Sequence, residues 1–159
     1  MVTTVSSSEE AELAGAAGAA EIVNYRSADV ASRVRQIAPG GVDLVVEVAP
    51  AQNLALDLEA LAVHGTLAYY ARIGGEEATL PLRESFAKNV RLQGVLLYTL
   101  AAELLDAATA DVTAAVAAGA LRVGRHAGLP LHQFRLEQTA AAHDAVEAGA
   151  VGKALIDLS

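Results

Sequence analysis

One stretch constrains the fold of this chain more than any other: residues 40–70, GGVDLVVEVAPAQNLALDLEALAVHGTLAYY. Its first part, residues 42–48, is almost entirely apolar, as expected for a strand covered on both faces. Leucines at helical spacing follow, and residues 66–71 then form a second short apolar run. A strand, a helix and a strand in this order predict a crossover between parallel strands.

The same alternation continues along the chain. Strands are predicted where short β-branched or aliphatic runs occur, and helices where apolar residues recur every three to four positions. The predicted strands are 2–5, 21–25, 42–48, 66–71, 91–98 and 153–158, with a short extended piece at 130–134. The predicted helices follow the serines at 6–8 and at Ser27, then cover 54–61, 84–89, 100–118 and 136–148. This alternation predicts an α/β protein with a mostly parallel sheet.

Such a sheet is typical of dinucleotide-binding domains, which open with a strand and a Gly-rich turn that holds the pyrophosphate. The chain contains neither a G-x-G-x-x-G sequence nor a Walker-type loop. The predicted fold is therefore a Rossmann-like α/β domain that lacks its first strand and its Gly-rich turn.

Composition excludes several classes of function. The formal net charge is -8, which disfavours nucleic acid and anionic membranes as partners because both require clustered basic residues. There is no cysteine, so a disulfide scaffold, a thiolate nucleophile and a Cys-ligated zinc site are excluded. No apolar run approaches about 18 residues, and the first residues lack the pattern of a secretory signal. A cytoplasmic location is expected.

Five stretches in this order resemble the medium-chain dehydrogenase/reductase superfamily, in particular its zinc-free quinone oxidoreductase branch. They are VTTVSSSEEAELAGAAGAAEIVNYR, GGVDLVVEVA, LEALAVHGTLAYYARIGG, LPLRESFAKNVRLQGVLLY and FRLEQTAAAHDAVEAGAVGKALIDL. The resemblance covers essentially the whole chain. It implies that residues 1–159 are one truncated Rossmann-type cofactor domain, the C-terminal part of a longer enzyme. Residues 122–134 and 153–159 would then be remnants of the contact with an absent catalytic domain.

Ser6 and Ser7 lie where the first strand meets a helix, a position that contacts the adenosine ribose in dinucleotide folds. Serines there leave room for a 2′-phosphate, which the N–H groups of a helix N-terminus favour. An acid would instead be expected for NAD. The sequence thus predicts a weak preference for NADPH over NADH, weak because Glu10 opposes a phosphate. An ordinary helix cap is the alternative role for both serines.

Further cofactor contacts are expected at the other strand ends. Val48, Tyr70 and Ala71 end two neighbouring strands at the carboxyl edge, where doubly wound sheets bind ligands. By resemblance, Tyr25 packs near the adenosine end, and Lys153 of the closing Gly-Lys motif approaches the cofactor cleft. Simple loop residues and a solvated lysine are the alternatives.

The four histidines, His64, His126, His132 and His143, fit no metal-binding spacing, and no G-x-S-x-G sequence indicates a hydrolase. No catalytic residue or metal site is predicted. The resemblance implies an NADPH-dependent enzyme that transfers hydride to a quinone or a conjugated carbonyl, although this chain alone is expected to be inactive. The alternative is a non-catalytic, stand-alone Rossmann-like dimerisation module.

Both interpretations share an expected homodimer. Residues 91–98 form the predicted outer strand of the sheet and carry little charge. An unpaired strand edge of this kind favours pairing with a second chain. By resemblance, family members join two sheets at this strand, so the expected interface is Val90–Tyr98.

Overall fold

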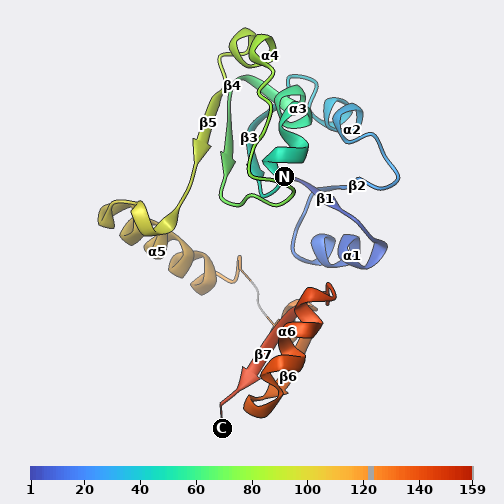
Figure 1. Cartoon of the computed structure of the whole chain (residues 1–159), viewed down its shortest axis with the longest axis vertical. Helices are drawn as coiled ribbons and strands as arrows, with labels where there is room; N and C mark the ends of the chain where they lie inside the picture. The colour runs from blue at the N-terminus through green and yellow to red at the C-terminus, as the bar shows by residue number, and fades with distance from the viewer. Residues whose placement is uncertain (122–123, 159) are drawn as a thin grey trace.

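A computed structural model describes residues 1–121 and 124–158 of the chain (Figure 1). The expected alternation of strands and helices is confirmed. The strands are β1 Val2–Val5, β2 Glu21–Asn24, β3 Val42–Glu47, β4 Leu61–Tyr69, β5 Arg91–Gly94, β6 Leu131–Arg135 and β7 Lys153–Asp157. The α-helices are α1 Ser8–Ala16, α2 Val30–Ile37, α3 Pro50–Ala60, α4 Leu82–Ala87, α5 Ala102–Ala117 and α6 Thr139–Glu147. Short 3₁₀ turns lie at Leu97–Thr99, Gly124–Ala127 and Leu136–Gln138.

All strand pairs are parallel, which confirms the Rossmann-like α/β class. The described strands form three separate sheets, β1–β2, β3–β4–β5 and β6–β7, where the sequence suggested one. Among the described residues, β1 and β3 do not pair with each other.

Helix α2 holds the first two sheets together. Its Val30 and Val34 are buried in one apolar cluster with Val23 of β2, and Val2 of β1 and Val42 of β3 pack against that cluster. The two sheets therefore share a core although they share no backbone hydrogen bonds between β1 and β3. The cap of α2 differs from the prediction: Asp29, not Ser27, precedes the helix, and its Oδ1 accepts from the Ser32 N–H at 3.1 Å.

A second core lies between α3 and the β3–β4–β5 sheet. Leu54, Leu58, Leu61 and Leu67 are buried there, and Val45 of β3 packs against them. The predicted leucine face of α3 is thereby confirmed, except that Leu61 is already the first residue of β4. This core fixes the ends of β3 and β4 relative to the start of α3.

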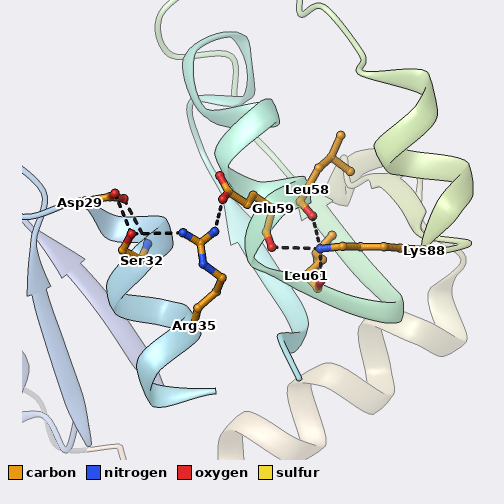
Figure 2. A network of polar contacts seen from close by, with 7 residues as sticks. All are labelled: Asp29, Ser32, Arg35, Leu58, Glu59, Leu61 and Lys88. Carbon is orange, nitrogen blue, oxygen red and sulfur yellow. Dashed lines mark hydrogen bonds and ion pairs between the residues drawn. The ribbon is translucent and has the colours of Figure 1, made fainter. Parts of the chain in front are cut away.

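Polar contacts add to this packing at the far end of α3 (Figure 2). Arg35 of α2 forms an ion pair with Glu59 of α3, and its Nη2 also donates to Ser32 Oγ at 3.1 Å. Lys88, which follows α4, donates its Nζ protons to the carbonyl oxygens of Leu58, Glu59 and Leu61, at 2.7, 3.0 and 2.6 Å. A cation on the last carbonyls of a helix is favoured by their partial negative charge.

The outer strand of the β3–β4–β5 sheet is β5, as predicted, but it is shorter than expected. It ends at Gly94, and Leu97–Thr99 turns into a 3₁₀ helix, so the prediction of a strand to Tyr98 was wrong. The pairing with β4 is closed by the Val95 N–H, which donates to the Tyr69 carbonyl at 2.9 Å.

The C-terminal elements are packed less tightly. Helix α5 has no buried residue, and its predicted apolar side, including Leu104, Val112 and Val116, is exposed. Beyond it, α6 packs on β6 and β7, and this small unit lies at the opposite end of the molecule from β5 (Figure 1). Residues 122–123 and 159, in the segments expected to face a catalytic domain, lie outside the described residues.

None of the described helices is long and apolar enough to cross a membrane.

Candidate functional site

The carboxyl ends of β1 and β2 bring the predicted adenosine contacts together. Ser6 and Ser7 directly follow β1, and Tyr25 directly follows β2. The Tyr25 N–H donates to the Val5 carbonyl at 3.0 Å, which places Tyr25 beside the end of β1. The Tyr25 side chain is 53% exposed, so its ring is accessible to a ligand.

Ser7 caps α1, which was the alternative role predicted for both serines, whereas Ser6 lies one residue before the cap. Ser7 Oγ accepts from the Glu10 N–H at 3.1 Å. The Glu10 carboxylate reaches back and accepts from the Ser6 N–H at 2.6 Å and from Ser6 Oγ at 2.9 Å. These bonds, the one from the Ser6 backbone first, lower the pKa of Glu10, and Arg26 adds a smaller effect. A carboxylate therefore already occupies the donors that an incoming phosphate would use.

The ends of β3 and β4 bring the other predicted cofactor contacts together. The Tyr70 N–H donates to the Glu47 carbonyl at 3.3 Å, and the Ile73 N–H donates to the Val48 carbonyl at 2.9 Å. Val48, Tyr70 and Ala71 therefore lie at one edge of the sheet. Tyr70 is 62% exposed, so this edge offers an aromatic side chain to solvent.

A hollow of about 320 Å³ opens next to this edge, between α3, β4 and the loop that follows β4. Its walls include Leu54, Leu67, Tyr69 and Ala71. The loop lies close to α3: a side chain at Gly74 would come within 2.5 Å of the Gln52 amide group. The flexible Gln52 side chain could move aside, but glycine is favoured at this turn because φ is +87°.

Sequence reasoning treated Glu47 only as a strand end and missed Asp57 altogether. In the structure both carboxyl groups are buried below this edge, at 8% and 3% exposure. The available signal was the spacing of Asn53 and Asp57, one helical turn apart on a helix that is otherwise lined by leucines.

Lys153 is not brought to this edge. It begins β7, which pairs with β6 in a separate sheet, and its side chain is exposed. His132 of β6 bonds through Nε2 with the Val151 carbonyl at 2.9 Å. Over the ranges 1–121 and 124–158, no group of three or more histidine, aspartate and glutamate side chains could hold a metal ion.

Comparisons with known proteins identify the family and the fold of this chain. The sequence model described as zinc-binding dehydrogenase matches residues 1–118. Among curated proteins, no sequence matches. A quinone oxidoreductase from Pseudomonas syringae superposes with a TM-score of 0.81 at 24% identity, over 98% of this chain and 48% of that chain.

Two further solved structures are 27% identical. A mycobacterial protein complexed with NADPH has a TM-score of 0.79, over 98% of this chain and 48% of that chain. An NAD-dependent alcohol dehydrogenase also has a TM-score of 0.79, over 99% of this chain and 43% of that chain. The chain thus spans less than half the length of each of these structures.

Proposed function

Because this chain belongs to the zinc-binding dehydrogenase family, we propose that it is the cofactor-binding portion of a cytoplasmic, NADPH-dependent oxidoreductase. The observation that carries the proposal is the gathering of Val48, Tyr70 and Ala71 at the carboxyl edge of the β3–β4–β5 sheet. Doubly wound sheets bind their ligands at that edge. The NADPH complex of a 27% identical protein supports the choice of a nicotinamide cofactor.

The residues present fit the two ends of such a cofactor better than its middle. Ser6, Ser7 and Tyr25 would hold the adenosine end, and the edge formed by Val48, Tyr70 and Ala71 would hold the nicotinamide end. The sequence has no Gly-rich turn for the pyrophosphate, so binding by this chain is expected to be weak. A bound cofactor would supply a hydride for a quinone or a conjugated carbonyl, a substrate class that rests on the sequence resemblance.

The preference for NADPH over NADH is proposed to be small because of Glu10. Its carboxylate holds both donors of Ser6, and its negative charge would face a 2′-phosphate. Removing that charge in Glu10→Gln should tighten NADPH binding about tenfold and change NADH binding much less. Glu9→Gln, in the same helical turn but exposed, is the matched control for net charge.

Fluorescence titration of both cofactors against the three proteins tests this proposal. Wild-type protein that binds NADH and not NADPH would overturn the cofactor preference. Protein that binds neither at millimolar concentration would favour the alternative, a non-catalytic dimerisation module. In the enzyme interpretation, the segments 122–134 and 153–159 are proposed to be remnants of the contact with a catalytic domain.

A homodimer through Val90–Tyr98 is part of the proposal. The outer edge of β5 is unpaired in the described chain, and Leu96, Leu97 and Tyr98 are exposed by 56%, 62% and 94%. The substitution Leu97→Asp would place a charge in the apolar interface and should make the protein monomeric, which sedimentation experiments would detect. Wild-type protein that is already monomeric at tens of micromolar would contradict the dimer.

A further inference from the structure

Two carboxyl groups, which form no ion pair with the residues that the structure describes, are buried beneath the proposed nicotinamide edge. Glu47 is the last residue of β3, and Asp57 lies in the middle of α3. Asn53, one turn before Asp57, donates one Nδ2 proton to Glu47 Oε2 at 3.2 Å, so this face of α3 is turned toward Glu47. Burying two negative charges side by side is costly, which requires a compensating interaction.

Glu47 has the partners that a carboxylate needs. Its Oε1 accepts from the N–H groups of Val48 and Ala49, at 2.7 and 2.5 Å, and its Oε2 accepts from Asn53. Ala49 caps α3 without any side-chain hydrogen bond of its own, so the Glu47 carboxylate satisfies donors at the start of this helix. Glu47 thereby fixes the turn that carries Val48.

Asp57 lacks such partners. Its Oδ2 is fully buried and has no hydrogen bond in the part of the chain that the structure describes. Two ionised carboxylates are both acceptors and cannot bond to each other, whereas a protonated acid donates one hydrogen bond. Burial first, then the negative charge of Glu47 and the hydrogen bond that a protonated Asp57 would donate to it, raise the pKa of Asp57 to about 7.

The charged groups on the neighbouring elements are engaged elsewhere. Arg35 of α2 pairs with Glu59, and Lys88 after α4 binds the carbonyl groups of the last turn of α3 (Figure 2). On β4, the Tyr69 hydroxyl lies over Gly94 of β5. Glu47 is therefore the charged group that controls the protonation of Asp57.

We propose that Asp57 is a positioning residue: as a neutral carboxylic acid it donates a hydrogen bond to Glu47 and so holds the β3–α3 turn at the cofactor edge. Its effect on cofactor binding rests on the proposed function, whereas its effect on folding does not. Loss of the shared proton places two negative charges in contact and loosens the turn.

The direction of the pH effect follows from linkage. The folded protein holds the proton of Asp57 more tightly than the unfolded chain does, because burial raises the pKa of this acid to about 7. The stabilisation is therefore complete below the unfolded pKa and is lost as the pH rises through the folded value. Asp57→Asn keeps a donor for Glu47 but cannot ionise, so it should remove this pH dependence.

The first test measures urea unfolding of wild-type protein, Asp57→Asn and the control Asp43→Asn between pH 5 and pH 8.5. Asp43 lies on β3 like Glu47 but is exposed. The urea midpoints of wild type and Asp43→Asn should fall as the pH rises through neutrality, and that of Asp57→Asn should stay level. Parallel curves for all three proteins would overturn the proposal.

A second measurement observes the wild-type protein itself. Carbon-13 NMR of aspartate-labelled wild type should show one carboxyl signal that titrates near neutral pH, which Asp57→Asn identifies by its absence. If every aspartate titrates in the ordinary acidic range, the proposal is wrong.

A third measurement separates this proposal from the proposed function. NADH affinity should fall over the same pH range in wild type but not in Asp57→Asn; NADH is used because its adenosine ribose carries no titrating phosphate. Level NADH affinity in wild type would refute the positioning role. If neither NADH nor NADPH binds at any pH, the proposed function fails, while the unfolding and NMR results still decide the state of Asp57.

Discussion

Two of the parallel strand pairs in the described chain, β3–β4 and β6–β7, are each connected through a helix and differ sharply in burial. In the β3–α3–β4 unit, Leu58, Leu61 and Leu67 have exposures of 0%, 1% and 1%. In the β6–α6–β7 unit, Ala142 alone is buried among the described residues, although β6 and β7 pair over five positions. The pairing of β6 with β7 is continuous, whereas that of β3 with β4 has a register shift between Val42 and Leu44. Regular backbone pairing therefore does not decide which unit has a core, and side-chain size does.

The difference originates in the helices. Helix α3 carries Leu54 and Leu58 at a spacing of four, so both point to the sheet. Helix α6 has the sequence TAAAHDAVE and buries only a methyl group. Because the hydrophobic contribution grows with the apolar area removed from water, alanine contributes far less than leucine.

The largest expected effect comes from comparing one position in each helix. Leu58→Ala should lower the free energy of unfolding by about 3–4 kcal/mol, since it removes a fully buried side chain and leaves a cavity. Val146→Ala in α6, where the side chain is 59% exposed, should cost less than about 0.5 kcal/mol. Urea denaturation followed by circular dichroism measures both, and equal losses would remove the distinction between the two units.

The two lysines of the chain provide the second comparison, because one lies in each region. Lys88→Met should cost about 1.5–3 kcal/mol, the range for hydrogen bonds to a charged group, since three carbonyl groups lose their donor. Lys153→Met should be nearly neutral because that side chain is exposed. Urea denaturation measures both variants. An unchanged free energy of unfolding in Lys88→Met would show that water replaces the ammonium group without cost.

These contrasts explain which features the sequence predicted. The order of strands and helices, the outer position of β5 and the leucine face of α3 follow from local patterns, and they are confirmed. The contacts of Lys88 span 27 to 30 residues, and no local pattern reports such a contact. The spacing of Asn53 and Asp57 indicates a polar side of α3, but it does not show that β3, which ends ten residues before Asp57, lies against that side.

Strand ends were the other weak point. The apolar run that predicted a strand to Tyr98 continues past Gly94, but only residues as far as Gly94 pair with β4. The apolar spacing of residues 100–118 predicted a helix, and α5 is one, but none of its residues is buried in the described chain. Hydrophobic periodicity identifies a face that favours burial, and it does not supply the surface that buries it.

A smaller effect is expected within the irregular part of β4. His64 has φ of +66°, a left-handed conformation that costs a side chain about 1–2 kcal/mol, and its N–H donates to the Lys88 carbonyl at 2.7 Å. His64→Gly keeps that N–H and should stabilise the protein by about 0.5 kcal/mol, since the greater freedom of unfolded glycine offsets part of the relief. His143→Gly in α6, a helix without strain, should instead destabilise by about 0.5–1 kcal/mol. A loss of stability in both variants would show that the strain at His64 is negligible.

The smallest expected effect concerns a surface ion pair and its contribution to the stability of the more deeply buried region. The ion pair of Arg35 and Glu59 joins α2 to α3 and so links the β1–β2 sheet to the β3–β4–β5 sheet. Both side chains are largely exposed, at 47% and 53%. Exposed ion pairs contribute about 0.2–1 kcal/mol, and salt screens them. A double-mutant cycle with Arg35→Met and Glu59→Gln should give a coupling energy in that range that falls as salt is added. A salt-independent coupling above about 2 kcal/mol would mean that this pair, rather than the shared cluster around Val30 and Val34, is the main link between the two sheets.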